Sequence, residues 1–123
     1  MKIRVYYEDT DAGGIVYHTN YLKYCERARS ELFFKQGLTP TDGDASGFVV
    51  RNINADFIGM AKLGEMLEIK SELIERKKSS LRLKQSVLRE GKPIFEMEIQ
   101  LLFVRNGRVT RIPEHLFDII DKG

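Results

Sequence analysis

The sequence predicts an α+β fold in which a mainly antiparallel, five- to six-stranded sheet packs against one long helix. After Gly47 apolar residues alternate with polar ones in stretches separated by turn residues, which is typical of strands with one buried face. Between residues 20 and 36 the apolar residues recur instead at three- and four-residue steps, as in an amphipathic helix. At 123 residues the chain has the length of one domain, so we expect residues 1–123 to form a single domain.

The chain is expected to open with a short strand over residues 1–7, where β-branched and aromatic residues prevail. Ile3, Val5 and Tyr7 lie on one side of its pleat. Residues 9–14 are small or Asx residues, which favour turns and admit positive φ at the glycines. This segment is predicted to be a loop.

The predicted helix covers residues 20–36. Thr19 or Asn20 can cap its start by accepting hydrogen bonds from the first free amides. At its end Gly37 suits the left-handed position, with Leu38 folding back on Phe33. Its apolar stripe is formed by Tyr21, Tyr24, Cys25, Ala28 and Leu32.

The rest of the chain is predicted to be mostly sheet. Residues 95–103 alternate most clearly, and Asn106-Gly107 suits a two-residue type I′ hairpin. Some apolar residues fall off the alternating core stripe, which predicts association into at least a homodimer. The expected strands are residues 48–58, 66–77, 81–89, 95–103 and 108–112, followed by a short helix over residues 113–120; the apolar residues off the stripe are Ile58, Ile74, Leu88, Leu102 and Val104.

Composition excludes several classes of protein. With 20 basic and 18 acidic residues the net charge is only +2, too small to imply a nucleic acid partner. The longest uncharged stretch, residues 12–22, falls far short of the ~20 apolar residues of a membrane span. Cys25 is the single cysteine, so no internal disulfide or Cys/His metal cluster is expected. Acidic residues near the start argue against a secretory signal, and we expect a cytoplasmic protein.

The segment from Glu8 to His18 is the first candidate site. It places carboxylates, two glycines and an imidazole between a strand and the start of a helix. The free amides of a helix N-terminus can hold an oxyanion, and a nearby carboxylate can act as nucleophile or general base. The residues alone are equally compatible with a plain turn in which the Asp residues cap the backbone and His18 is packed or solvated.

The run from Val5 to Tyr21, with Tyr24, Glu26, Arg27, Ala28 and Arg29 after it, closely resembles the YbgC-type acyl-CoA thioesterases. These proteins belong to the hotdog superfamily and are similar to the 4-hydroxybenzoyl-CoA thioesterases. The resemblance covers almost the whole chain in element order. It implies a hotdog fold, with one long central helix wrapped by the sheet, and hydrolysis of acyl-CoA thioesters.

The resemblance also implies roles for particular residues. Asp11 matches the catalytic carboxylate, and the backbone amide of His18 matches the group that polarises the thioester carbonyl. The side chain of His18 matches one implicated in the site. Tyr7 matches a position close to the site, although a packed strand tyrosine is the alternative.

A second candidate segment, residues 75–92, is strongly basic. In the 4-hydroxybenzoyl-CoA enzymes a basic triplet matching Lys77, Lys78 and Ser79 contacts the nucleotide phosphates of CoA, and Ser79 departs from that triplet. A hairpin edge protected by lysines is the alternative. Phe48, Val49 and Val50 match positions beside the pantetheine arm or acyl group, with core packing as the alternative.

The leading hypothesis is therefore an acyl-CoA thioesterase that acts as a homodimer or dimer of dimers. No metal or redox cofactor is expected, and CoA enters as part of the substrate. The resemblance adds acyl carrier protein as a further partner. The rival hypotheses are a hotdog dehydratase and a non-catalytic module that binds acyl-CoA or acyl carrier protein.

Overall fold

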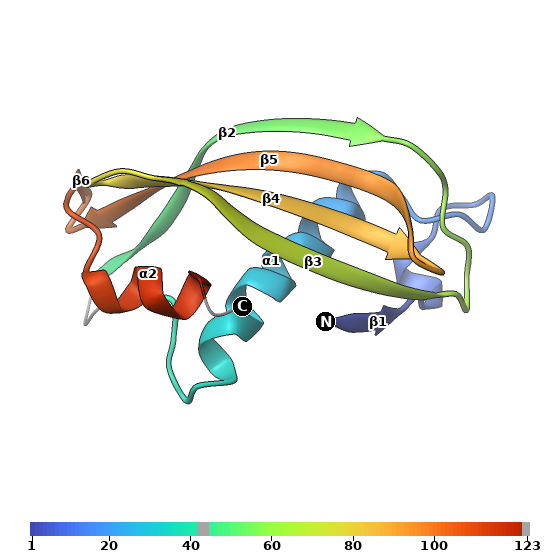
Figure 1. The fold of residues 1–123 in the computed structure, drawn as a ribbon. Coiled ribbons are helices and arrows are strands. Elements are labelled where there is room, and N and C mark those ends of the chain that lie inside the picture. The colour runs from blue at the N-terminus through green and yellow to red at the C-terminus, as the bar shows by residue number, and fades with distance from the viewer. Residues whose placement is uncertain (42–44, 122–123) are drawn as a thin grey trace.

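The computed structural model describes residues 1–41 and 45–121 (Figure 1). Six strands form one sheet in the order β1-β3-β4-β5-β2, with β6 paired to β5, and every pair of neighbours is antiparallel. The strands are β1 (Lys2–Arg4), β2 (Ser46–Phe57), β3 (Met66–Arg76), β4 (Ser80–Arg89), β5 (Lys92–Arg105) and β6 (Arg108–Val109).

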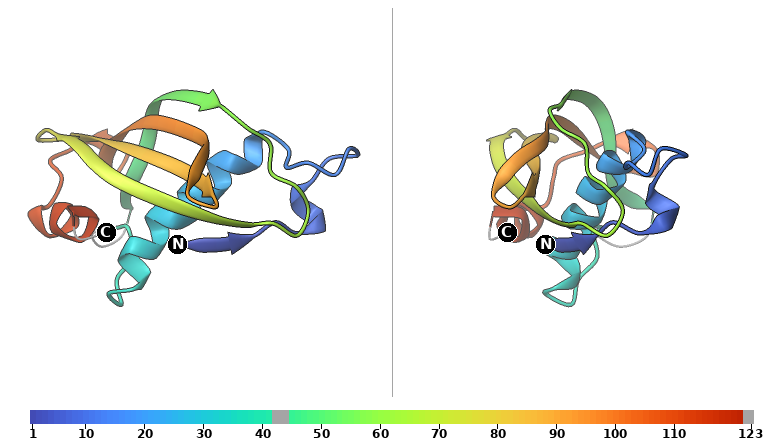
Figure 2. Two further views of the ribbon diagram at one scale, coloured as in Figure 1. Left: turned by 45° about the vertical axis from the view of Figure 1, so that its right-hand side comes forward. Right: turned by 90° about the vertical axis from the view of Figure 1, so that its right-hand side faces the viewer.

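The sheet curves around a single long helix, α1 (Thr19–Phe34), as both views in Figure 2 show. A second helix, α2 (Glu114–Asp121), packs against α1 at one end of the sheet. The predicted α+β class, a mainly antiparallel sheet wrapped around one helix, is confirmed. All five residues of the predicted stripe are buried, and Phe33 is buried with them. The buried residues of α1 are Tyr21, Tyr24, Cys25, Ala28, Leu32 and Phe33.

The core lies between α1 and the inner face of β3, β4 and β5. Alternate residues of β5 from Phe95 to Phe103 are buried, as the period-two pattern predicts. Aromatic rings link the layers, since Tyr21 of α1 stacks on Phe95 with ring centroids 5.3 Å apart. Burial of these rings and aliphatic side chains supplies the main driving force for wrapping the sheet around the helix.

The first predicted strand is too long. β1 ends at Arg4, and Tyr7 begins a short 3-10 turn, η1 (Tyr7–Asp9). The turn forms because the buried Asp9 carboxylate accepts a 2.9 Å hydrogen bond from the Tyr6 amide and pulls the chain out of the sheet. The Tyr7 side chain is consequently 82% exposed and does not join Ile3 and Val5 on the inner face.

The start of α1 also differs from the prediction. His18 occupies the N-cap position, and its side chain makes no capping hydrogen bond. Asn20, one of the two predicted caps, instead donates from its side-chain amide to the Asp9 carbonyl at 2.8 Å. At the other end the prediction is confirmed: Gly37 has a φ of 71°, and the Leu38 amide donates to the Phe33 carbonyl.

The Asn106-Gly107 hairpin is confirmed, because both residues have positive φ, as a type I′ turn requires. The returning strand is shorter than predicted. After Val109 the chain crosses to the β3–β4 turn, where the Ile112 amide donates to the Lys78 carbonyl at 2.8 Å. The last predicted helix is α2, displaced by one residue.

The inner face of β2 is only partly covered by α1. β2 is an edge strand of twelve residues, and β5 is its one partner among the described strands. Val50, Ile53 and Phe57 point toward α1 yet remain 38% to 52% exposed. Of the five residues predicted to mark an association surface, Ile58 and Ile74 are exposed, while Leu88, Leu102 and Val104 are half-buried. Exposed apolar side chains therefore follow β2 and continue beyond its end at Ile58, Met60 and Leu63.

Candidate functional site

The loop that carries Asp11 is a small, self-contained hairpin. Thr10 pairs with Val16, the Asp11 amide donates to the Ile15 carbonyl at 2.9 Å, and Gly14 turns the chain with a φ of 80°. The Asp11 Oδ1 accepts a 2.8 Å hydrogen bond from the Gly13 amide. Its Oδ2 makes no hydrogen bond within the described part of the chain. Asp11 therefore presents one carboxylate oxygen from an exposed loop that projects from the end of the molecule (Figure 2).

Asp9 ties this loop to the start of α1. Its carbonyl accepts hydrogen bonds from the Tyr17 amide at 3.0 Å and from the side-chain amide of Asn20 at 2.8 Å. Its buried carboxylate holds the Tyr6 amide. Residues before and after the Asp11 hairpin are thus fastened at one point. The sequence does not predict this anchoring role of Asp9, and its only signal there is the position of Asp9 two residues before Asp11.

Tyr24 of α1 lies near the Asp9 carboxylate. Its hydroxyl is buried and meets no partner in hydrogen-bond geometry among the described residues. Burial and the neighbouring Asp9 carboxylate both raise the pKa of Tyr24. The Tyr24 phenol therefore stays neutral and adds no second negative charge beside the buried Asp9 carboxylate.

Residues 58–65 support the loop from its other side. The Val16 amide donates to the Ala61 carbonyl, and the Leu63 amide donates to the Gly14 carbonyl. The Ala61 amide in turn donates to the Tyr21 hydroxyl at 3.0 Å. The Asp11 hairpin is therefore bonded to this segment on one side and to the N-terminus of α1 on the other.

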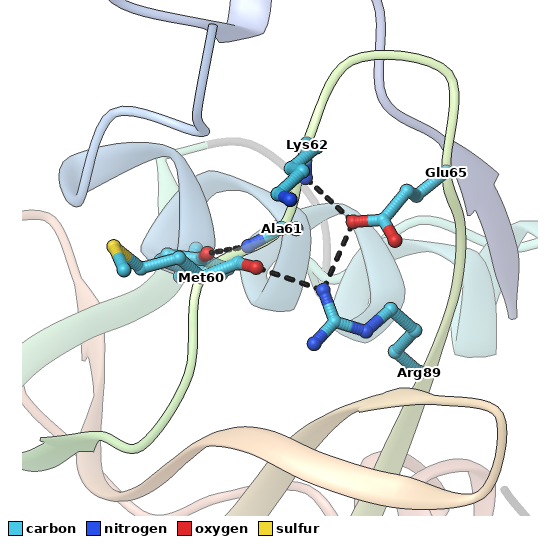
Figure 3. A network of polar contacts seen from close by, with 6 residues as sticks. Met60, Ala61, Lys62, Glu65 and Arg89 are labelled. Carbon is cyan, nitrogen blue, oxygen red and sulfur yellow. Dashed lines mark hydrogen bonds and ion pairs between the residues drawn. The ribbon is translucent and has the colours of Figure 1, made fainter. Parts of the chain in front are cut away.

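A polar network holds residues 58–65 in shape (Figure 3). Arg89 of β4 donates from Nη1 to the Met60 carbonyl at 2.8 Å and to Glu65 Oε1 at 2.9 Å. The same Glu65 oxygen accepts from the Lys62 amide at 2.7 Å. Desolvation acts to raise the pKa of Glu65, but the Lys62 amide and the Arg89 guanidinium outweigh it and hold that pKa below its usual value. The carboxylate thus stays charged and keeps the network intact.

The N-terminus of α1 offers amide donors beside the loop. The Asn20 and Tyr21 amides donate to the Tyr17 and His18 carbonyls, so the earlier amides of His18 and Thr19 are the ones that helix geometry leaves without an intrahelical acceptor. The first turn of α1 contains no acidic residue, so its positive end is not compensated locally. The His18 ring is exposed and packs at 4.6 Å from Tyr17 and 6.0 Å from Phe57, measured between centroids.

The backbone of Tyr7 is bonded to the start of the Asp11 loop. Its carbonyl accepts hydrogen bonds from the Thr10 amide and hydroxyl, at 3.1 and 2.8 Å. Its exposed ring stands on the surface beside the loop. The structure thus gathers Asp11, His18 and Tyr7 at one end of the molecule.

Lys77, Lys78 and Ser79 lie at the opposite end, in the turn between β3 and β4 (Figure 1). Both lysines are exposed, and the Lys77 amide donates to the Ser80 carbonyl at 2.8 Å. β3 starts next to the Asp11 loop and ends at this turn, so its eleven residues separate the two places by roughly 35 Å. A single chain therefore does not bring the lysines near Asp11.

Phe48 and Val50 line a cavity of about 310 Å³ between α1 and the sheet. Val49 lies between them in sequence and pairs with Leu102, so its side chain points to the outer face of the sheet. Two of the three residues predicted to contact the acyl or pantetheine group thus share one cavity wall.

The fold, a helix wrapped by a curved antiparallel sheet, is found in a known protein family. Residues 5–120 match the family model described as the Thioesterase-like superfamily. The chain belongs to this superfamily. Over 121 residues it is 46% identical to the acyl-CoA thioesterase YbgC of Helicobacter pylori, covering 91% of this chain and 90% of that protein. It is 38% identical over 108 residues to the acyl-CoA thioester hydrolase YbgC of Escherichia coli, covering 83% and 78%.

The thioesterase-like fold is shared with solved structures. A variant of 4-hydroxybenzoyl-CoA thioesterase in complex with 4-hydroxybenzoyl-CoA superposes with a TM-score of 0.85 over 98% of this chain and 96% of that one, at 23% identity. The likeness is one of fold. The resemblance to YbgC-type proteins and the predicted hotdog fold are both confirmed.

Two other findings concern metals and membranes. Within residues 1–41 and 45–121, no three His, Cys, Asp or Glu side chains come together as a metal site. Neither helix of the described structure is long and apolar enough to cross a bilayer.

Cys25 is fully buried in the core, and burial raises the pKa of its thiol to about 12.

Proposed function

We propose that this protein hydrolyses acyl-CoA thioesters to the free carboxylic acid and CoA. The observation that supports the proposal is the anchoring of the Asp11 hairpin to the start of α1, through the hydrogen bonds of the Asp9 carbonyl with Tyr17 and Asn20. The relatives named as acyl-CoA thioesterases support the same reaction. A thioester is already an activated acyl group, so the reaction needs no metal or redox cofactor.

Asp11 supplies the chemical step. In one route its Oδ2 attacks the thioester carbonyl, the C–S bond breaks with loss of the CoA thiolate, and water hydrolyses the resulting mixed anhydride. In the other route Asp11 takes a proton from a water molecule that attacks the carbonyl directly. In both routes the carbonyl oxygen becomes an oxyanion, which the His18 amide at the helix N-terminus stabilises.

The complete site requires two chains. The roughly 35 Å between Asp11 and the lysine turn, taken along β3, is too far for one chain to position both ends of a substrate. Among the described strands, the long edge strand β2 pairs on one side only. Its inner face is apolar and partly exposed, as expected of a strand that meets a second copy. We therefore propose a homodimer, or a dimer of such dimers.

The partner copy supplies the phosphate-binding groups. Lys77 and Lys78 are exposed cations in the turn between β3 and β4, suited to the 3′-phosphate and pyrophosphate of CoA, and Lys77 Nζ lies 3.6 Å from Glu75 Oε1. The side chains of Phe48 and Val50 suit the apolar part of the substrate. Acyl carrier protein presents an acyl group through the same kind of thioester and is included as a partner. The single, buried cysteine suits a reducing compartment, so we place the protein in the cytoplasm.

The test compares wild type with Asp11→Asn on a panel of acyl-CoAs. We expect hydrolysis by wild type and a 10²- to 10⁴-fold lower kcat for the variant. Glu8→Gln is the matched control, because Glu8 is an exposed carboxylate three residues away that the proposal does not use.

Other results would support other functions. Equally slow hydrolysis by wild type and Asp11→Asn, with binding retained, indicates a binding module. Hydration of crotonyl-CoA in preference to hydrolysis indicates a dehydratase.

A further inference from the structure

The cavity of about 310 Å³ lies between the C-terminal half of α1 and the inner face of the sheet. Its size and its mostly apolar wall suit a hydrocarbon group rather than a polar one. The apolar lining comes from α1, β2, β4, β5 and α2, through Leu32, Phe33, Phe48, Val50, Leu83, Leu101 and Ile120.

One cation, Arg29, also lines this cavity. Its Nη1 donates to Gln85 Oε1 at 2.9 Å. Gln85 is fully buried in β4, and its amide nitrogen donates to the Cys25 carbonyl and to Ser71 Oγ, both at 2.9 Å. Those two bonds fix the orientation of the Gln85 amide, so its oxygen holds the guanidinium of Arg29 in place.

The nearby charge of Glu26 favours the charged form of the Arg29 guanidinium, but no carboxylate of the described residues is bound to it. Gln85 is neutral, and among the described residues Arg29 forms no ion pair. Glu26 lines the same cavity one turn earlier but is exposed, where water screens its charge. Burial lowers the pKa of Arg29, although a guanidinium remains charged at neutral pH. A largely buried cation with few of its five N–H groups bonded is costly, and a carboxylate bound there would remove that cost.

An apolar track joins this cavity to the proposed reaction centre. β2 runs antiparallel to α1, since Phe57 lies beside His18 with ring centroids 6.0 Å apart and Phe48 lies beside Phe33 at 6.4 Å. Between those two contacts the inner face of β2 presents Val50 and Ile53, both partly exposed. An acyl chain that starts at the His18 amide can therefore follow apolar side chains to the cavity.

The length of the track follows from helix geometry. Glu26 and Arg29 are eight and eleven residues beyond His18, which corresponds to roughly 12 to 17 Å along α1. An extended hydrocarbon advances ~1.3 Å per carbon, slightly less than the ~1.5 Å of one C–C bond. About nine carbons therefore reach Glu26, the first cavity residue on α1, and about thirteen carbons reach Arg29.

We propose that the cavity binds the far end of the acyl group and that Arg29 recognises a terminal carboxylate there. The preferred substrates are then CoA monothioesters of dicarboxylic acids about twelve to thirteen carbons long. This specificity rests on the proposed hydrolysis at Asp11. It assigns Arg29 and Gln85, which the thioesterase chemistry does not use, to the selection of substrate.

The test measures kcat/KM for matched pairs of substrates. The pairs are dodecanedioyl-CoA with dodecanoyl-CoA, and adipoyl-CoA with hexanoyl-CoA. Wild type is expected to favour the twelve-carbon diacid by at least tenfold. It should show no such preference at six carbons, because that chain is too short to reach Arg29.

Variants of Arg29 separate recognition from folding. Arg29→Met should lower kcat/KM for dodecanedioyl-CoA about 30- to 100-fold and change that for dodecanoyl-CoA less than threefold. Arg29→Lys keeps the charge and should retain part of the preference even if Arg29→Met does not fold. Arg27→Met is the matched control, since Arg27 is exposed on the same helix and does not line this cavity.

A binding measurement distinguishes failure of this inference from failure of the proposed function. Calorimetry with free dodecanedioate and dodecanoate requires no hydrolysis. Tighter binding of the diacid that Arg29→Met abolishes supports the carboxylate site even if no thioester is cleaved. Equal affinity for the two acids, together with equal kcat/KM for their CoA thioesters, would overturn it.

Discussion

Two aspartates two residues apart have opposite environments. Asp9 is buried and accepts hydrogen bonds from the backbone of Tyr6 and Tyr17 and the side chain of Asn20, whereas Asp11 is exposed and, among the described residues, accepts hydrogen bonds only within its own loop, from the amides of Gly13 and Gly14. The buried residue positions the loop, and the exposed residue is left available for chemistry. Residue type alone does not separate these roles, because both fit an Asx turn.

Replacing each aspartate by alanine should separate stability from activity. Asp9→Ala leaves the part-buried Tyr6 amide without its acceptor, so we expect a loss of about 1–3 kcal/mol in the free energy of unfolding. Asp11→Ala should change stability by less than ~0.5 kcal/mol, because the residue is exposed, and should abolish hydrolysis. Urea unfolding and kcat measured on both proteins check this. A large stability loss in Asp11→Ala would contradict it.

The buried thiol of Cys25 predicts a pH dependence of stability. Its pKa is raised by burial from 9.0 to about 12, so the folded state retains the proton more strongly than the unfolded chain. The resulting stabilisation is complete below pH 9 and is lost as pH rises from 9 toward 12. At pH 10.5 the loss is about 2 kcal/mol.

Cys25→Ala is the comparison protein for this effect. Urea unfolding from pH 8 to pH 10.5 should show a steeper decline in wild type than in the variant. Parallel curves would mean that the thiol ionises equally easily in both states.

At the scale of elements, the strands and α1 followed closely from apolar periodicity, because burial of one face dictates it. Two predictions, the end of the first strand and the caps of the helix, are wrong because a side chain bonds to the backbone. β1 stops early because Asp9 caps a turn, and the predicted caps of α1 are wrong because Asn20 bonds to Asp9. The support of the Asp11 hairpin by residues 58–65 was not predicted, since it depends on long-range bonds from Arg89 that no local pattern encodes.

The Arg89 network predicts an effect of a distant residue on catalysis. Arg89→Gln removes the bonds to Glu65 and Met60, so residues 58–65 and the hairpin they support should become more mobile. We expect kcat to fall about 3- to 10-fold, and amide hydrogen exchange at Val16 and Leu63 to accelerate. Lys84→Gln, an exposed position on the same strand, should leave both unchanged. Faster exchange in both variants would argue against a specific network.

At the scale of the whole molecule, the Asp11 loop and the lysine turn occupy opposite ends of a curved sheet (Figure 1). Their presence in one reaction was predictable from the resemblance to a family, but their separation became evident only from the course of β3. Along β2 the sheet also leaves apolar side chains exposed that neither α1 nor α2 covers. Both features support the proposed working unit of two chains.

Complementation between two inactive variants tests this claim most directly. Asp11→Asn lacks the carboxylate, and the double variant Lys77→Glu/Lys78→Glu lacks the phosphate-binding cations. In a dimer of one chain of each kind, one of the two sites combines an intact Asp11 with intact lysines. Co-expression in equal amounts should therefore give about one quarter of wild-type acyl-CoA hydrolysis, because half the dimers are mixed and half their sites are intact. Activity no greater than the mean of the two variants measured separately would contradict a site shared between chains.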